Sequence, residues 1–136
     1  MNFKYGHGPR GFTIVELMIV IVILAILVAL AYPSYINYVR KAKRGEAEQL
    51  LMNWSVNQEI YRSNNPTYAG ADELNVPQHD DYAFSIDPAD PAGTYTLTAT
   101  ATGDQLKDTA KGDCTVLTLN SDGVKAPGIC WGGTST

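Results

Sequence analysis

A continuous apolar run dominates the N-terminal part of the sequence. Fifteen apolar residues follow one another from Leu17 to Ala31, and between Phe12 and Ala31 only Thr13 and Glu16 are polar. Twenty helical residues span about 30 Å, which is the thickness of the hydrocarbon core of a membrane. A helix that is apolar on every side has no place inside so small a domain, because too little chain remains to cover it. We therefore expect a membrane-spanning helix rather than a buried core helix.

The helical pattern continues beyond this run and changes character. Apolar residues recur with the spacing of one helical face at Ala47, Leu50, Leu51, Trp54 and Tyr61. Pro33 removes one backbone donor between the two parts, so we expect a kink or local unwinding there. Asn64-Asn65-Pro66 should end the helix. The pattern predicts one helix of about 50 residues, apolar in front and amphipathic behind.

After residue 66 the period of the pattern changes to two, which is typical of strands. The predicted strands are 82–86, 94–101 and 114–119, with a short fourth strand around Val124. The turn Ser121-Asp122-Gly123 leads into that last strand, and residues 87–93 form a connection. We predict an α+β fold in which the long N-terminal helix packs on a small antiparallel sheet. The expected core comprises Leu50, Leu51, Trp54, Phe84, Leu97 and Leu117.

The composition indicates the size of the fold and shows that charge is distributed unevenly along the chain. The 136 residues suit one domain, and their net charge is −4. From Gly45 to the C-terminus, thirteen acidic residues face four basic ones, a net charge of −9. Such a surface repels phosphate backbones and disfavours broad nucleic-acid binding. A local basic patch formed by residues 40–44 with Lys107 and Lys111 remains an alternative.

The inventory of chemically reactive residues favours a non-enzymatic protein. Two cysteines and two histidines leave little for a zinc site, and His7 lies in a basic N-terminal tail, so a Ser-His-Asp arrangement would depend on His79. The remaining candidate ligands and acids are Asp80-Asp81, Asp87 with Asp90, and Asn120-Ser121-Asp122-Gly123. The last segment lacks the spacing of a calcium loop. We interpret these carboxylates as solvated loop charges and expect no catalytic residues, metal or cofactor.

Glu16 separates three interpretations of the apolar run. The run could be a secretory signal peptide that is cut after Ala31, a plain anchor, or an assembly helix that is later moved out of the membrane. A charged carboxylate in such a stretch is costly unless it has a partner and a function. If the chain were cut between Gly11 and Phe12, a new amine would lie four residues before Glu16. In one helix residues four apart share a face, so the two charges could pair within one chain or between neighbouring chains.

The sequence resembles a known family at this point. The stretch Gly11-Phe12-Thr13-Ile14-Val15-Glu16-Leu17 resembles the N-terminus of type IV pilins and of type II secretion pseudopilins. The basic leader ending in residues 8–11 and the segments 31–35 and 38–47 extend the resemblance. Residues 114–119, 121–123, Pro127 and Cys130-Trp131 are similar to the C-terminal disulfide region of small pilins. That second similarity favours a pilin over a pseudopilin.

The resemblance implies a processing and assembly route. A prepilin peptidase would cut after Gly11 and N-methylate Phe12, and Glu16 would neutralise the amine of a neighbouring subunit. Residues 1–11 would be the removed leader, 12–39 the transmembrane and assembly helix, and 40–136 the exported globular domain. The partners would be other pilin subunits, the peptidase and the pilus assembly machinery. The chain would lie in the bacterial inner membrane before assembly and in a cell-surface pilus afterwards.

The implied export shapes the remaining expectations. In an oxidising compartment we predict a Cys114–Cys130 disulfide, which contributes roughly 3 kcal/mol in the chain-entropy model. Trp131 should pack on that bond, and Tyr61 and Tyr68 should be packing residues. The basic residues Arg40, Lys41, Lys43 and Arg44 are expected to form a solvated collar that contacts lipid headgroups.

We interpret the chain as a structural subunit of a type IV pilus, a minor pilin. The alternatives are a minor pilin that acts mainly as a DNA- or surface-binding module, a type II secretion pseudopilin, and an exported enzyme behind an ordinary signal peptide. The enzyme alternative leaves Glu16 unexplained. Adhesion, twitching motility, DNA uptake and secretion all remain open as the task of the filament.

Overall fold

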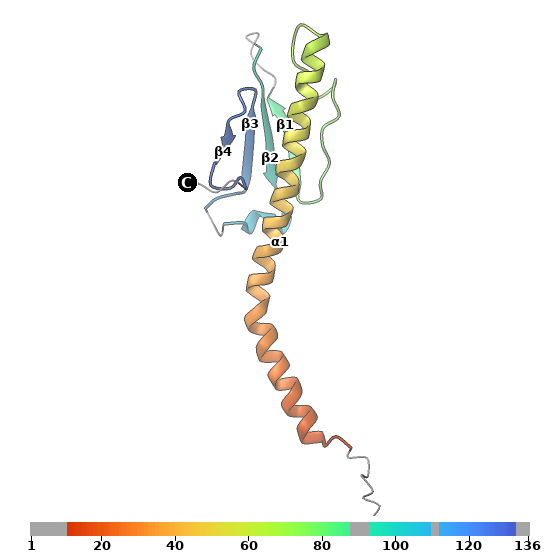
Figure 1. Cartoon of the computed structure of the whole chain (residues 1–136), viewed down its shortest axis with the longest axis vertical. Helices are drawn as coiled ribbons and strands as arrows, with labels where there is room; N and C mark the ends of the chain where they lie inside the picture. Colours follow the sequence, from red (N-terminus) through yellow and green to blue (C-terminus); the bar gives the residue numbers. More distant parts are fainter. Residues whose placement is uncertain (1–10, 88–92, 110–111, 133–136) are drawn as a thin grey trace, which may run out of the picture. The chain divides into compact units, whose positions relative to one another are not determined.

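The computed structural model describes residues 11–87, 93–109 and 112–132 and divides into two compact units after Ile36. Its elements are α1 (Ile14–Asn64), β1 (Tyr82–Asp87), β2 (Thr96–Ala101), the 3₁₀ helix η1 (Gly103–Lys107), β3 (Val116–Asn120) and β4 (Lys125–Ala126) (Figure 1). The predicted α+β class and the long N-terminal helix are confirmed. The leader residues 1–10, the centre of the connection predicted at 87–93, Lys111 and the last four residues lie outside the described part.

Helix α1 begins two residues later than expected, because a side chain caps its first turn. The hydroxyl of Thr13 accepts a hydrogen bond from the backbone N–H of Glu16 at 3.1 Å. The helix ends at Asn64, as predicted from Asn64-Asn65-Pro66. The chain remains helical through Pro33, so the expected local unwinding is wrong. One missing donor leaves the helical hydrogen bonds on both sides of Pro33 in place.

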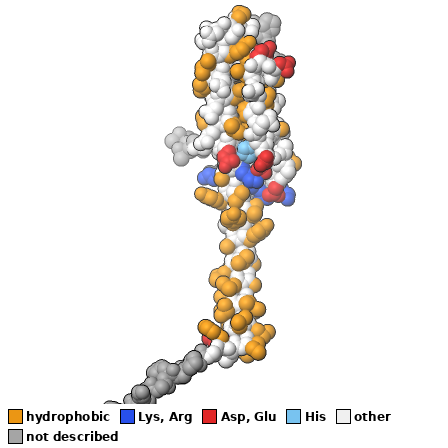
Figure 2. All heavy atoms as spheres, turned by 90° about the vertical axis from the view of Figure 1, so that its right-hand side faces the viewer, with side chains coloured by type: hydrophobic (Ala, Val, Ile, Leu, Met, Phe, Trp, Pro, Cys, Tyr) orange, Lys and Arg blue, Asp and Glu red, His pale blue; other side chains and the backbone are white. Residues whose placement is uncertain are grey.

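The first unit is a bare apolar helix. Between Gly11 and Tyr35 every described residue is exposed, and the exposure of Phe12 reaches 85%. Apolar side chains cover the visible surface of this part of α1 (Figure 2). By length and composition, α1 is the one helix of the described chain that could cross a membrane.

The second unit, from Asn37 onward, contains a four-stranded antiparallel sheet. The strands follow one another in chain order, and the register pairs Phe84 of β1 with Ala99 of β2 and Ala99 with Leu117 of β3. The C-terminal half of α1 runs along one face of this sheet (Figure 1). The predicted strands are confirmed with shifted ends: β2 starts at Thr96 rather than Thr94, and β3 runs from Val116 to Asn120.

The core lies between α1 and the alternate residues of the sheet. Of the expected core residues, Leu51, Trp54, Leu97 and Leu117 are buried. Leu50 and Phe84 are only partly buried, which corrects the prediction. The buried face of α1 comprises Arg44, Ala47, Glu48, Leu51, Trp54 and Gln58. Leu50 lies at the edge of this buried face. Three polar side chains, those of Arg44, Glu48 and Gln58, occupy part of the face itself.

A disulfide closes the C-terminal part of the sheet. Cys114 before β3 and Cys130 after β4 are bonded, which confirms the predicted pair. Both sulfurs are buried, and Trp131 packs with them in the core as expected. The indole N–H of Trp131 donates to the carbonyl oxygen of Ala126 at 3.3 Å. The bond therefore fixes the short strand β4 and the segment after it against the rest of the sheet.

Reduction of this disulfide should destabilise the second unit. We expect the free energy of unfolding to fall by about 3 kcal/mol, because the unfolded chain regains the freedom of a loop closed over sixteen residues. Urea unfolding of the full chain in detergent, with and without reductant, measures this difference. Equal unfolding midpoints in samples whose two thiols are both shown to be free would contradict it.

Candidate functional site

The N-terminal edge of α1 carries the residues that the sequence singled out for processing and assembly. Gly11 and Phe12 precede the helix and are fully accessible, and Glu16 lies in its first turn. A carboxylate in this position is favoured by the positive end of the helix dipole. Glu16 makes no ion pair within the described part of the chain. Any partner for it in an apolar environment must therefore come from another molecule or from a newly formed N-terminus.

The sequence predicted that a new amine at Phe12 and the carboxylate of Glu16 lie on one helical face, and the structure meets this expectation only in part. Phe12 lies outside the helix, because α1 begins at Ile14 after the Thr13 cap. Residues 12 and 16 therefore do not share a helical face in this form of the chain. Pairing between neighbouring chains does not require such a face.

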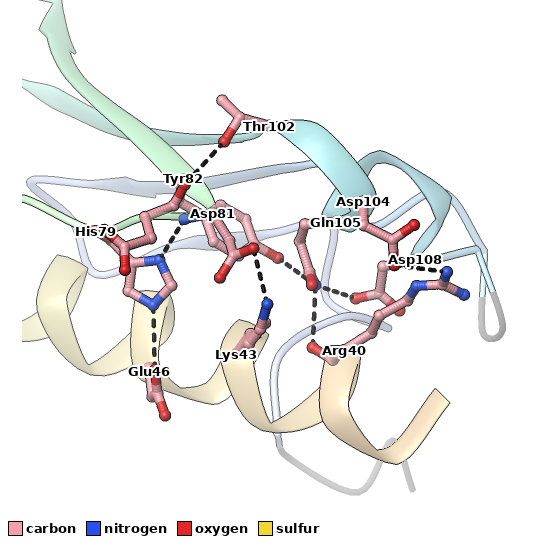
Figure 3. Close-up of polar contacts among 11 residues, drawn as sticks. Arg40, Lys43, Glu46, His79, Asp81, Tyr82, Thr102, Asp104, Gln105 and Asp108 are labelled. Atoms are coloured by element: carbon pink, nitrogen blue, oxygen red, sulfur yellow. Dashed lines mark hydrogen bonds and ion pairs between the residues drawn. The ribbon is translucent and has the colours of Figure 1, made fainter. Parts of the chain in front are cut away.

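Three of the four residues in the basic cluster that follows the apolar run are ion-paired within the domain, which corrects the predicted solvated collar, whereas Lys41 is exposed as expected. The guanidinium of Arg40 pairs with Asp104 at 2.9 Å, and the ammonium of Lys43 pairs with Asp81 at 2.8 Å (Figure 3). The buried guanidinium of Arg44 is paired with the buried carboxylate of Asp108. Figure 2 shows the basic side chains of this face close to acidic ones in one band of the unit, with further acidic side chains near its opposite end. The cations were mistaken for surface charges because their partners lie 38 to 64 residues away in sequence.

Glu48 extends the Arg44 pair to the C-terminal segment. One of its carboxylate oxygens lies 3.8 Å from Nε of Arg44, and the other accepts the backbone N–H of Gly132 at 3.1 Å. These contacts run from Asp108 through Arg44 and Glu48 to Gly132. They connect the residue after η1, the helix and the segment after the disulfide. Removal of one partner of such a buried pair is costly, because it leaves the other charge uncompensated.

A buried amide ties η1 to the helix beside this pair. The side-chain amide nitrogen of Gln105 lies 3.0 Å from the carbonyl oxygen of Arg40 and 3.0 Å from the hydroxyl of Tyr82 (Figure 3). Burial raises the pKa of Tyr82 to about 12. The phenol therefore stays neutral at physiological pH. Sequence periodicity missed Gln105 and Asp108, and only the helical spacing of Arg44 and Glu48 hinted at this network.

His79 is occupied by structural contacts. Its Nδ1 accepts the backbone N–H of Asp81 at 3.0 Å, and its Nε2 lies 3.1 Å from a carboxylate oxygen of Glu46. With Nδ1 accepting, the neutral ring carries its proton on Nε2 and donates it to Glu46. Within the described ranges these are the two hydrogen-bond partners of the imidazole, and neither is a hydroxyl or a thiol.

The candidate ligand segment Asn120-Ser121-Asp122-Gly123 is a capped turn. The side-chain oxygen of Asn120 accepts the backbone N–H groups of Asp122 and Val124. Gly123 supplies the positive φ of 76° that the turn needs. Among residues 11–87, 93–109 and 112–132, no three His, Cys, Asp or Glu side chains converge as metal ligands. Asp90 of the candidate pair Asp87/Asp90 lies outside these ranges.

A hollow of about 490 Å³ lies beside the disulfide. It is lined by Glu48, Met52, Lys125, Gly128, Trp131 and Gly132. The ammonium of Lys125 lies 5.1 Å from the centre of the Trp131 ring and 3.6 Å from the sulfur of Met52. Lys125 has no carboxylate partner in the part of the chain that the structure describes. It is therefore a cation that remains able to contact an anion from outside.

Comparison with known proteins agrees with this arrangement. A family model described as type IV minor pilin ComP, DNA uptake sequence receptor, matches residues 33–118, and a model of the prokaryotic N-terminal methylation motif matches residues 7–32. The solved structure of a type IV pilin from Shewanella oneidensis is 25% identical with a TM-score of 0.58, and the match covers 69% of this chain and 99% of that one. No curated protein matches the chain significantly.

The first model covers more than half of the chain, and the solved pilin has a similar fold over 69% of it. The exposed apolar helix and the methylation motif occupy the same N-terminal residues. The chain therefore belongs to the family of type IV minor pilins.

Proposed function

We propose that this minor pilin is cut by a prepilin peptidase between Gly11 and Phe12, is N-methylated at Phe12 and is assembled through its N-terminal helix. Residues 12–39 hold it in the inner membrane beforehand, and residues 40–136 form the exported domain. The observation that carries the proposal is the exposed apolar surface of the first unit, which overlaps the matched methylation motif. The partners in this scheme are the peptidase, the assembly machinery and other pilin subunits.

In this scheme the apolar surface of α1 is buried in two successive environments. Lipid covers the apolar side chains of α1 before assembly, and the same side chains of neighbouring subunits cover them afterwards. Association then gains little from hydrophobic burial, because lipid tails are as apolar as leucine. Close packing and paired charges must set the register between subunits.

Glu16 supplies that register. Its carboxylate has no partner in the described chain, and cleavage after Gly11 creates an amine at Phe12. In a packed apolar bundle both charges are costly unless they meet. A neighbouring subunit that is shifted along the filament axis leaves both charges unpaired. The shifted arrangement is therefore less stable.

Replacement of Glu16 by alanine should leave membrane insertion intact and block assembly. An uncompensated amine in an apolar core costs about 3 kcal/mol or more, so incorporation into filaments should fall roughly a hundredfold. Quantifying the protein in sheared pili and in membranes measures both steps. Asp72→Ala removes an exposed carboxylate in the second unit and serves as the control. Normal incorporation of Glu16→Ala would refute the role assigned to this residue.

We propose DNA binding during uptake as a second function, because the family model over residues 33–118 describes a DNA uptake sequence receptor. The patch expected from residues 40–44, Lys107 and Lys111 is not the site that we favour. Arg40, Lys43 and Arg44 are paired with carboxylates, as is Lys107 with Asp104. Lys111 lies outside the described residues. Lys125, beside the hollow and Trp131, is the better candidate for a phosphate contact.

Lys125→Ala should weaken binding of the full chain in nanodiscs to duplex DNA, most strongly at low salt concentration. Loss of one phosphate contact should reduce the slope of log affinity against log salt by about one. Lys107→Ala, which removes an exposed but paired cation, is the matched control and should change the slope much less. Identical slopes for the wild type and Lys125→Ala would contradict the assignment.

A further inference from the structure

We propose that the sulfur of Met52 is a site of reversible oxidation by peroxide, and that the resulting sulfoxide holds the ammonium of Lys125 and so weakens its contact with DNA. The proposal rests on the DNA binding proposed above for Lys125 and adds a way of regulating it. Met52 belongs to α1 and Lys125 to β4, both within the second unit, and both side chains line the hollow beside the disulfide.

Met52 is the methionine of this chain that is open to an oxidant in water. The sequence contains three methionines, Met1, Met18 and Met52. Met1 belongs to the leader that the proposed cleavage removes, and Met18 lies in the apolar run that lipid or neighbouring subunits cover. Met52 is 37% exposed at the edge of a hollow of about 490 Å³, which leaves room for a peroxide molecule to approach the sulfur. Oxidation of a side-chain sulfur follows its exposure, so Met52 should react first.

Only weak contacts hold the ammonium of Lys125 beside this sulfur. Nζ donates to the sulfur at 3.6 Å and lies 5.1 Å from the centre of the Trp131 ring. A thioether is a weak acceptor, and a cation near an aromatic ring at the protein surface gains little. Glu48, which also lines the hollow, is engaged with Arg44 and with the backbone N–H of Gly132. The ammonium is therefore held loosely and can turn toward a phosphate.

Oxidation replaces this weak acceptor with a strong one. A lone pair of the Met52 sulfur attacks one oxygen of hydrogen peroxide, and the O–O bond breaks. The proton on the attacked oxygen passes to the other oxygen, which leaves as water. The sulfur thus loses two electrons and carries a new oxygen, while the peroxide is reduced. The product is a polar sulfoxide, and methionine sulfoxide reductases convert it back to the thioether.

The new oxygen can reach the ammonium of Lys125. A charge-assisted N–H···O bond is about 2.8 Å long. The 3.6 Å between the sulfur and Nζ exceeds this length by less than one S–O bond, so an S–O bond that leans toward Lys125 places its oxygen at hydrogen-bond distance. A phosphate must then break this bond before it binds the ammonium, which opposes DNA binding. Met52 lies outside the core cluster, so the added oxygen should leave the domain folded.

Treatment of the full chain in nanodiscs with hydrogen peroxide tests the proposed site. Peptide mass spectrometry follows the gain of one oxygen at each methionine over time. We expect Met52 to react at least about tenfold faster than Met18, because lipid shields Met18 from the oxidant. Equal rates at the two positions would overturn Met52 as the selective site.

The affinity of the same samples for labelled duplex DNA tests the link to Lys125. Oxidation should weaken binding by the wild type about threefold, because the phosphate must displace one hydrogen bond. Met52→Leu is the matched control, since leucine is apolar, similar in size and lacks the sulfur. Lys125→Ala should be equally insensitive to peroxide, because the ammonium that the sulfoxide holds is absent.

The outcomes separate this proposal from the DNA contact on which it rests. Unchanged affinity of the oxidised wild type, in a chain whose binding depends on Lys125, overturns the regulation. An equal loss of affinity in oxidised Lys125→Ala also overturns it, because oxidation then acts elsewhere. An untreated wild type that binds no better than Lys125→Ala overturns the DNA contact itself, while the mass spectra still decide whether Met52 is the oxidised site. Recovery of affinity after treatment with a methionine sulfoxide reductase supports the proposal.

Discussion

The structure depends on one constraint: the chain cannot cover the apolar surface of its own N-terminal helix. Every described residue from Gly11 to Tyr35 is exposed, and the core of the second unit draws only on residues from Ala47 onward. Water is a poor solvent for such a surface, so it must lie in lipid or against other copies of itself. A membrane precursor and a filament subunit are the two states that satisfy this requirement. The methylation motif matched at residues 7–32 overlaps this exposed apolar surface.

The C-terminal half of the same helix has a different role, because the small sheet packs against it. Ala47, Leu51 and Trp54 supply apolar contacts, while Arg44 and Glu48 reach the residue after η1 and the C-terminal segment through charges. These polar links are directional, whereas apolar packing is not. They fix how the sheet is placed along the helix, and the disulfide fixes the segment after it.

Most of the architecture could be predicted from periodicity, because the apolar run, the end of α1 at Asn64 and the alternation in β1 and β2 are local signals. The resemblance at residues 11–17 anticipated the family. The ion pairs could not be predicted, since nothing in the sequence relates Arg40 to Asp104 or Arg44 to Asp108 before the chain folds. Hydrophobic periodicity also overlooks buried polar residues such as Gln58 and Gln105. The sequence therefore predicted a solvated collar where Arg40, Lys43 and Arg44 are ion-paired, and it did not single out Lys125 as an available cation.

In our proposal the apolar helix becomes the N-terminus of the mature subunit. The intact mass and N-terminal sequence of the protein from its native membranes would decide whether it does. We expect a chain that begins at N-methylated Phe12, with the leader through Gly11 removed. A chain that begins at Tyr32 would mean an ordinary secreted domain without the helix, and one that retains Met1 would mean a plain anchor. Either of those results would contradict the assembly of this protein through its N-terminal helix.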